Sequence, residues 1–383
     1  MKSMIRQYGL ITLFNYNYGS ALQCYATKEF LKTKGATSDL LTLRNERGTL
    51  VSIALRMQQL LGLCFHNPQH VSSILKVFLA SRSTNLTLSQ QSVSDIQSFV
   101  LNQIKPCSCT YKDLTEKSIQ KYDAFFSGSD QVWNSFRVED YESFFLRFAP
   151  KEKRIAWAPS FGSQSIAEWN KKRYKEYISE FRILSAREES GAKLIKELTG
   201  RDAIVLPDPV TLLNADEWRS QYKGFNLNTV SNEYVLLFFI DRPSNKALEA
   251  VRRINGKKIL SFGYHYQEYD CLGNYCHVDG DPFEFIHYID KADMVVTDSY
   301  HACVFSIIMG TAFYAYKRNY QHAQDQSGRI TELLEQTGLS NRFEADSIDM
   351  NQIYDYEKAY QFFEDGKKKA SQYLAMVMEQ VNE

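Results

Sequence analysis

The segment VVTDSYHACVFSIIMG, residues 295–310, contains a histidine between a predicted strand and a predicted helix. In open α/β sheets, ligands commonly bind at such turns. Val295 and Val296 predict a short buried strand, and the apolar residues 304–309 predict a buried helix, so His301 lies on a strand-to-helix turn. Such turns offer unpaired helix N–H groups to anions. Imidazole titrates near neutrality and can act as a general acid or base. The alternative is a structural histidine beside a helix cap formed by residues 297–299.

Arg187 is a second candidate. It lies in LSAREESG, residues 184–191, where a predicted strand passes into a predicted helix. A guanidinium at that position can hold a carboxylate or a phosphate with two parallel hydrogen bonds. The alternative is an ion pair with Glu188 or Glu189.

Two further turns that follow predicted strands are rich in small polar residues. In the turn within GLITLFNYNYGSALQCYAT, a glycine allows close backbone approach and a helix start points N–H groups into a cleft. The turn in FFSGSDQVWNSF, residues 125–136, suits hydrogen bonding to a ligand rich in hydroxyl groups. Plain capping is the alternative for both. The candidates in these turns are Asn17, Gly19, Ser20, Gly128, Ser129, Asp130 and Gln131.

Metal and nucleotide signatures are weak. There is no GxGxxG after the first strand and no GxxxxGK[ST], so ordinary dinucleotide and phosphate-loop sites lose support. The pattern CLGNYCH, residues 271–277, is better explained as a loop than as a metal site. In DGDPFEF, Asp281, Pro282 and Glu284 have the pattern of a helix N-cap, first-turn proline and capping box. We expect no metal and no cofactor.

The elements that position these residues alternate between strand and helix. YGLITLFN, SALQCYATKEFLKTKG and SDLLTL predict strand, helix and strand, which indicates a parallel sheet. Residues 50–118 interrupt this alternation with helical patterns and predict an insertion. The alternation resumes at YDAFFSG, continues to AIVLPDP, and begins again after a polar stretch at 221–233 that predicts a linker.

This organisation predicts two α/β domains with a cleft between them. We expect an N-terminal domain at residues 1–225, with the helical insertion at about 50–118, and a C-terminal domain at 226–345. A C-terminal helical segment at 346–383 follows, in which Gly366 is the weak point of a long helix or helix pair.

Composition excludes several classes of function. Lysine plus arginine and aspartate plus glutamate are each 45, so no net charge attracts nucleic acid. The longest apolar runs are about six residues, against the ~20 that a membrane-spanning helix needs. The N-terminus has a short apolar run but no cleavage-site pattern, and the seven cysteines have no paired spacing. We expect a cytoplasmic protein that does not bind nucleic acid.

Seven segments, in order and in matching spacing, resemble the polysaccharide pyruvyl transferase family. They are NYNYGSALQCYAT, DAFFSGSDQVWN, IAWAPSFG, LSAREESG, LPDPVTLL, DPFEFIHYIDKADMVVTDSYHACVFSIIMGTAFYAY and SGRITELLEQTGLSNR. The resemblance implies an α/β protein with two Rossmann-like domains in a GT-B-like arrangement. It also implies transfer of the pyruvyl group of phosphoenolpyruvate onto a sugar as a cyclic ketal, with release of phosphate.

The resemblance assigns roles to residues of this chain. The essential histidine of the family falls on His301, and its donor-binding arginine falls on Arg187. Some members have Arg-Leu-His where this chain has Ser299, Tyr300 and His301, so one cation is absent. Lys317 and Arg318 are the nearest replacements, followed by Arg329. The expected donor site is Arg187, Ser299, Tyr300, His301, Lys317 and Arg318.

The acceptor is expected to lie against the N-terminal domain, near Asn17, Gly19, Ser20, Gly128, Ser129 and Gln131. Asp130 is a candidate base for a sugar hydroxyl or, alternatively, a turn cap. The acceptor would be a sugar of a cell-surface polysaccharide or exopolysaccharide, or its lipid-linked oligosaccharide precursor. Peripheral association with a membrane is compatible with that acceptor.

Two rival functions remain open. A GT-B-like fold also occurs in glycosyltransferases that use nucleotide sugars, and a fold does not by itself determine a function. The chain could instead be a non-catalytic protein of polysaccharide assembly, which the serine at position 299 keeps open.

Overall fold

The computed structural model describes residues 5–14, 17–43, 49–83, 88–110, 113–114, 119–136, 142–223, 233–273, 275–318, 327–351 and 354–381. The first sheet has the strand order β3-β2-β1-β4-β5, and all of its strands are parallel. These strands are β1 (Arg6–Ile11), β2 (Ala36–Leu43), β3 (Cys107–Cys109), β4 (Ala124–Ser127) and β5 (Arg154–Ala156). Helix α1 (Tyr18–Thr33) connects β1 to β2 and makes the expected parallel crossover.

Short elements extend the first sheet on the β5 side. Helices α6 (Lys171–Ser179) and α7 (Glu189–Thr199) alternate with a two-stranded parallel sheet formed by β6 (Ser185–Ala186) and β7 (Ile204–Val205). A bridge between Ile155 and Ile183 joins the two sheets. The short helices η6 (Pro209–Leu212) and α8 (Ala215–Tyr222) complete this unit.

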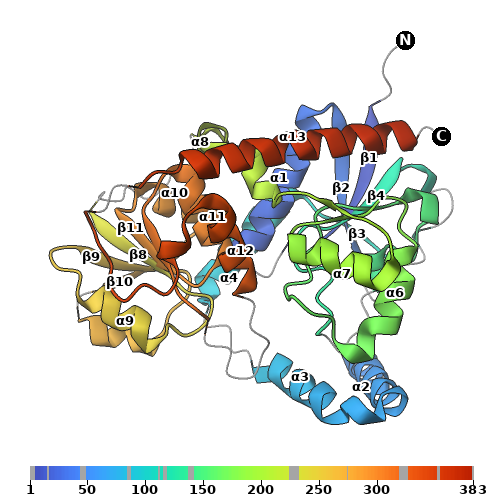
Figure 1. Cartoon of the computed structure of the whole chain (residues 1–383), viewed down its shortest axis with the longest axis horizontal. Coiled ribbons are helices and arrows are strands. Elements are labelled where there is room, and N and C mark those ends of the chain that lie inside the picture. The colour runs from blue at the N-terminus through green and yellow to red at the C-terminus, as the bar shows by residue number, and fades with distance from the viewer. Residues whose placement is uncertain are drawn as a thin grey trace.

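The second sheet repeats the arrangement of the first, with the order β10-β9-β8-β11-β12 and parallel pairing throughout. Its strands are β8 (Tyr234–Phe238), β9 (Lys258–Phe262), β10 (Tyr275–Val278), β11 (Met294–Thr297) and β12 (Phe313–Ala315). Its helices are α9 (Asn245–Arg252), α10 (Pro282–Lys291), α11 (Tyr300–Met309) and α12 (Gly328–Thr337). The two sheets stand side by side in Figure 1. The expected boundary between residues 225 and 226 lies outside the described residues.

The region expected to be a helical insertion, at about residues 50–118, contains helices and one edge strand. Helices α2 (Thr49–His66) and α3 (Val71–Ser83) form a hairpin, and α4 (Gln90–Phe99) and η2 (Val100–Ile104) return the chain to the body. Cys107–Cys109 then pairs with β2 as an edge strand of the first sheet. The sequence CSC carries no apolar run, so this strand gives no hydrophobic signal. Residues 111–112 and 115–118 lie outside the described part.

The C-terminal segment is one helix, α13 (Glu357–Gln380), that lies along both units (Figure 1). Gly366 does not break it. A Cβ at Gly366 would lie 3.0 Å from the Pro207 ring, so glycine permits the helix to pass close to the N-terminal unit. The Tyr373 hydroxyl donates to Ala156 O at 2.6 Å, and Arg182 donates to Gln380 O at 2.6 Å. No helix of the described part is long and apolar enough to cross a bilayer.

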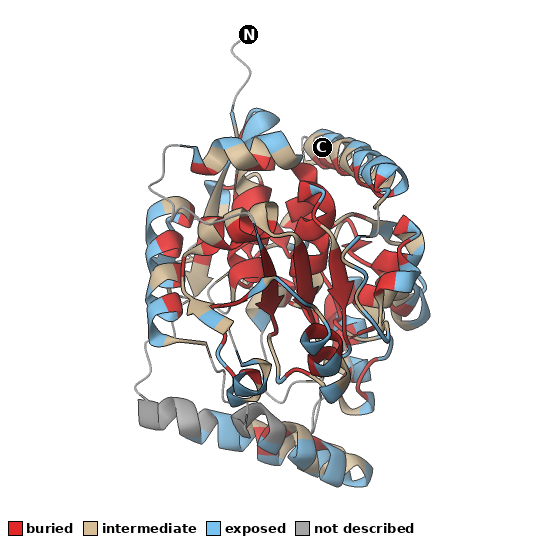
Figure 2. Cartoon of the chain, turned by 90° about the vertical axis from the view of Figure 1, so that its left-hand side faces the viewer, coloured by how far each residue is buried: buried red, intermediate tan, exposed pale blue. Residues whose placement is uncertain are grey.

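Helix α1 connects the two units through Tyr18. Tyr18 starts a helix of the first unit, yet its ring lies 5.2–5.8 Å from the rings of Phe238, Phe262 and Phe285 in the second. A single apolar cluster accordingly includes buried residues of both sheets, of α1 and of α13. In Figure 2 the buried residues run through the centre of the molecule.

Candidate active site

His301 lies in the first turn of α11, directly after β11, as the sequence predicts. The Oγ of Ser299 caps this helix by accepting from Ala302 N. His301 is only 8 % exposed, and its Nε2 lies 3.4 Å from Asp208 Oδ2 in the first unit. The histidine therefore meets the opposite unit at a buried carboxylate.

Gly19 forms the surface on which the His301 ring rests. A Cβ at this position would overlap the Nδ1, Cγ and Cβ atoms of His301. Asn17 and Ser20 hold the turn by a capping box, in which Asn17 Oδ1 accepts from Ser20 N at 2.9 Å and Ser20 Oγ accepts from Asn17 N at 3.2 Å. Gly19 therefore lies against His301, whereas Asn17 and Ser20 cap helix α1.

Arg187 follows strand β6, and its side chain is 1 % exposed. Its Nε donates to Glu188 Oε1 at 2.9 Å, and its Nη1 donates to Asp208 Oδ2 at 2.6 Å. Among the described residues, Nη2 has no hydrogen-bond partner. Burial would lower the pKa of this guanidinium, but Glu188 and Asp208 raise it above its ordinary value. Arg187 is therefore charged, fixed in position, and has one donor group left over.

Asp208, which is not among the site residues predicted from the sequence, joins Arg187 to His301. Burial would raise the pKa of its carboxyl, but His301, Arg187 and the backbone N–H of Val210 hold that pKa well below its usual range. Asp208 is also the N-cap of η6. A carboxylate between two prolines at the end of a predicted strand, in LPDP, was the signal that could have identified it.

Tyr300 lies between two guanidinium groups. The Arg187 Cζ is 4.9 Å from the centre of the Tyr300 ring, and the Arg329 Cζ is 5.5 Å from it. Cations over an aromatic face are attracted by its quadrupole. The ring therefore brings Arg329, from α12, close to Arg187, from the other unit.

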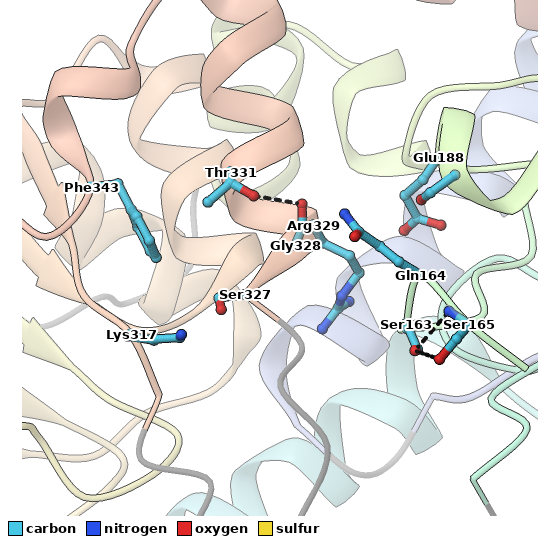
Figure 3. A pocket seen from close by; sticks show the side chains of 12 residues that line it. Ser163, Gln164, Ser165, Glu188, Lys317, Ser327, Gly328, Arg329, Thr331 and Phe343 are labelled. Carbon is cyan, nitrogen blue, oxygen red and sulfur yellow. Dashed lines mark hydrogen bonds between the residues drawn. The ribbon is translucent and has the colours of Figure 1, made fainter. Parts of the chain in front are cut away.

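A cleft of about 450 Å³ opens beside this cluster, between the two units. Gly162, Ser163, Gln164, Ser165, Glu188 and Ser190 line one wall, and Lys317, Ser327, Gly328, Arg329, Thr331 and Phe343 line the other. Figure 3 shows the two walls, with Arg329 extending toward the wall of Gln164 and Glu188. Gln164 lies close to Gly328, where an added Cβ would be 3.2 Å from Gln164 Nε2. The N-terminus of α12 lies on the cleft wall.

The two expected replacement cations are placed differently. Lys317 lines the cleft. Arg318 is held by Asp298, since its Nε donates to Asp298 Oδ2 at 3.2 Å and its Nη2 donates to Asp298 O at 3.3 Å. Asp298 also accepts from Ile240 N and Asp241 N. Arg318 thus fixes a loop of the second unit, and Arg329 lies closer to the cluster.

The turn at residues 128–131 lies behind Arg187. Asp130 is 6 % exposed, and its Oδ1 lies 4.0 Å from Arg187 Nη1 and accepts from Gln131 N at 2.8 Å. Ser129 Oγ donates to Ala158 O at 3.0 Å. Gly128 has φ +115°, and a Cβ there would overlap Trp157 O, while the Gln131 amide packs on Gly162. Residues 157–162 thus pack against this turn, and the Asp130 carboxylate faces Arg187.

The weak metal pattern has an ordinary structural explanation. His277 lies on β10, where its Nδ1 is 2.9 Å from Ser261 Oγ and its Nε2 is 3.2 Å from Asp279 Oδ1. No group of three histidine, cysteine or acidic residues with metal-binding geometry occurs in the described part of the chain. The capping box at Asp281, Pro282 and Glu284 is confirmed at the start of α10.

Comparison with known proteins gives a family and a fold. A family model described as polysaccharide pyruvyl transferase matches residues 17–320. The solved UDP-N-acetylglucosamine 2-epimerase of Rickettsia bellii is similar, with a TM-score of 0.50 and 10 % identity over 99 % of this chain and 97 % of that one.

The UDP-GlcNAc 2-epimerase of Methanocaldococcus jannaschii gives a TM-score of 0.46 and 12 % identity over 98 % of this chain and 100 % of that one. A comparison with curated proteins gives no significant match. At 10 % identity, the similarity to the Rickettsia bellii structure establishes the GT-B-like α/β fold alone, which confirms the expected fold class.

Proposed function

Because the chain belongs to the polysaccharide pyruvyl transferase family, we propose that it transfers the pyruvyl group of phosphoenolpyruvate to a sugar. The acceptor is a sugar of a cell-surface polysaccharide or exopolysaccharide, or of its lipid-linked precursor. The product is a ketal and the leaving group is phosphate.

The observation that carries this proposal is the convergence of Arg187 and His301 on Asp208. Arg187 and Asp208 come from the first unit, and His301 comes from the second. Arg187 Nη2 is buried and has no hydrogen-bond partner among the described residues. A buried donor without a partner is costly, and a ligand anion that accepts from Nη2 would satisfy it.

The donor would bind with its two anionic ends on separate groups. Arg187 Nη2 would hold the carboxylate, because a guanidinium pairs well with a planar anion. The phosphate would lie at the N-terminus of α12, where Arg329 and Lys317 line the cleft. Glu188 and Asp208 already compensate the charge of Arg187. Arg329 and Lys317 on the opposite wall would add positive charge to the cleft.

The chemistry needs one proton relay. A sugar hydroxyl adds to C2 of the enol phosphate, and a proton delivered to C3 makes the methyl group. A second hydroxyl then bonds to C2 as the C2–O bond to phosphate breaks, and the two hydroxyl protons balance the equation. His301 would supply the proton to C3 or hold the leaving phosphate as an imidazolium. Asp208, whose Oδ2 lies 3.4 Å from His301 Nε2, would keep the imidazole oriented.

The proposed binding site of the sugar acceptor is inferred from the residues that lie near Arg187 and His301. Asp130 remains the candidate base for a sugar hydroxyl, since its carboxylate lies 4.0 Å from Arg187. Gly19, Asn17, Ser20 and the 128–131 turn surround the same cluster and would bound the acceptor. Ser163 and Ser165 on the cleft wall add hydroxyl groups that can bind sugar hydroxyls.

Calorimetric titration of phosphoenolpyruvate into the purified protein tests the donor. We expect saturable binding, weakened at least about tenfold in Arg187→Gln, which removes a charge-assisted hydrogen bond worth more than 1.4 kcal/mol. Arg329→Gln should also weaken binding. The matched control is Arg318→Gln, since Arg318 is held by Asp298. UDP-glucose is titrated in parallel.

Two results would contradict the proposal. Binding of UDP-glucose without phosphoenolpyruvate would favour a nucleotide-sugar glycosyltransferase. Binding of neither ligand, in a protein whose circular dichroism and thermal unfolding are normal, would favour a non-catalytic role. With a donor site established, His301→Ala should lower turnover by about 10²–10⁴, the range of general acid–base catalysis.

A further inference from the structure

Helices α2 and α3 present an apolar stripe to solvent. Met57, Leu61 and Phe65 follow one another at a spacing of one helical turn, and they are 39, 65 and 82 % exposed. Leu75 and Leu79 on α3 are 40 and 62 % exposed. These five residues define the hairpin stripe. Large apolar side chains gathered on one exposed face indicate a binding surface rather than an incidental feature.

Helix geometry places both halves of the stripe on the same side of the hairpin. Leu60 on α2 and Ile74 and Phe78 on α3 form the buried contact between the helices. Leu61, Leu75 and Leu79 each follow one of these residues by one position. Because the two helices run antiparallel and each residue advances about 100° around its axis, residues one position after the buried ones point to the same face of the pair.

The hairpin meets the body of the protein at Trp169. Trp169 packs against the buried hairpin cluster and also contacts the rings of His70 and Phe136. In Figures 1 and 2 the hairpin forms a separate layer at the lower end of the molecule, and α13 lies at the upper end. The stripe therefore lies on an outer end of the protein, where no described element covers it.

The charge of the α2–α3 hairpin indicates which kind of partner binds there. The chain has no aspartate or glutamate between Glu46 and Asp95, although acidic and basic residues balance over the whole sequence. The hairpin itself contains Arg56, Lys76 and Arg82. Arg56 and Lys76 are exposed, and no ion pair joins either of them to another described residue. A basic helix pair with one apolar face is typical of proteins that lie in the interface of an anionic bilayer.

We propose that the α2–α3 hairpin docks the protein onto the surface of an anionic lipid bilayer. The stripe enters the boundary between headgroups and acyl chains, and the basic side chains attract the headgroups. A second copy of this chain fits less well, because pairing two such faces would bring the same cations together.

Docking would also bring the cleft close to the membrane. Ser165 lines the cleft, and Trp169, four residues later, contacts the hairpin. If the proposed function holds, this position favours an acceptor that the membrane presents, such as a lipid-linked oligosaccharide. The docking itself does not depend on the donor chemistry.

Vesicle flotation of the full chain tests the inference, with vesicles of phosphatidylcholine alone and of phosphatidylcholine mixed with phosphatidylglycerol. We expect binding to the mixed vesicles that declines with added salt. Leu61→Ser/Phe65→Ser should reduce the bound fraction at least about tenfold. The matched control is Leu101→Ser, because Leu101 is 67 % exposed on η2, outside the hairpin.

A second pair of variants tests how much the basic side chains of the hairpin contribute to vesicle binding. Arg56→Gln/Lys76→Gln should weaken binding at least about fivefold and flatten its dependence on salt. Lys193→Gln/Lys369→Gln, which removes two exposed charges elsewhere, should leave binding unchanged.

Three results would overturn the inference. They are equal binding to both kinds of vesicle, binding that the hairpin variants leave intact, and absence of binding by a correctly folded protein. Sedimentation of the same variants identifies a self-association surface if a dimer dissociates in Leu61→Ser/Phe65→Ser. Phosphoenolpyruvate titration of each variant should be unchanged, so failure of docking and failure of the donor proposal are distinguishable.

Discussion

At the scale of single residues, Asp208 is the group on which the candidate site depends. It is fully buried, yet it accepts a hydrogen bond from Arg187 and lies 3.4 Å from His301. A buried carboxylate is stable only when cations and N–H groups compensate its lost hydration. The cluster therefore keeps Arg187 and His301 in place even in the absence of a ligand.

The depressed pKa of Asp208 predicts the acid response of the protein. Because its folded pKa lies below the ordinary value of 3.8, the unfolded chain takes up a proton first as the pH falls. The stability that ionised Asp208 contributes to the folded protein is complete above pH 3.8 and is lost progressively at lower pH. Asp208→Asn should cost about 3–5 kcal/mol at neutral pH, because it removes one of the two carboxylates that compensate the buried charge of Arg187.

Urea denaturation of both proteins at neutral pH and at about pH 3 measures this difference, because the gap in unfolding free energy should narrow on acidification. Equal pH dependence of the two proteins would show that Asp208 is not ionised in the native state. Asp202→Asn, a change at an exposed surface carboxylate, is the control.

Gly19 makes a second residue-scale prediction. A single methyl group there would overlap the His301 ring, so Gly19→Ala should displace the imidazole and weaken phosphoenolpyruvate binding at least about tenfold. The measurement is the same calorimetric titration. Gly62→Ala is the control, because a Cβ at Gly62 meets nothing within 4 Å. It should stabilise α2 by about 0.5–1 kcal/mol and leave donor binding unchanged. Unaltered binding in Gly19→Ala would remove the histidine from the donor site.

At the scale of elements, α13 is the feature that the sequence described least well. Its pattern predicts a helix, but nothing local indicates that this helix returns to the first unit. Its contacts with Pro207 and Ala156 are made by residues that are remote in sequence. The glycine that looks like a helix breaker is a point of close packing.

Tyr373→Phe should therefore loosen α13 at a defined place. The substitution removes the hydrogen bond to Ala156 O and should lower the free energy of unfolding by about 1 kcal/mol. Ser185 Oγ also donates to that carbonyl, so the carbonyl keeps one partner. Urea denaturation measures the change. Tyr360→Phe, at a tyrosine that is 42 % exposed, is the control and should be neutral. A loss equal to that of the control would mean that α13 is not held at this contact.

At the scale of the whole molecule, the two units share one core. Tyr18 belongs to the first unit by sequence and to the second by packing, and the apolar cluster includes both sheets. The candidate site lies at the junction of the units, since each contributes part of it. Any relative movement of the units would change the distance between Arg187 and His301.

The shared core predicts a single cooperative unfolding transition. Tyr18→Ala should destabilise the protein by about 3–5 kcal/mol and separate the unfolding of the two units. Scanning calorimetry detects this as a calorimetric enthalpy that exceeds the van't Hoff enthalpy. Tyr122→Ala, which removes a buried ring within the first unit, should lower the transition temperature without dividing the transition. Two transitions in the native protein would contradict the shared core.

The sequence alone determined the features that depend on near neighbours. Apolar runs and capping residues predicted most strands of both sheets, the turn that carries His301, and the capping box at Asp281. The sequence pattern did not predict β3 and β10. These edge strands, CSC and YCHV, are partly exposed and lack an apolar run.

Which of the candidate residues lie together depends on packing between elements that are remote in sequence. Arg187, Asp208 and His301 belong to different turns, and their convergence follows from the packing of one unit on the other. The same packing put Gly19 under the histidine, turned Arg318 toward Asp298, and placed Arg329 over Tyr300. Hydrophobic periodicity specifies which face of an element is buried, but not which remote element covers it. The chemistry of the turns is therefore visible in the sequence, whereas their assembly into one site is not.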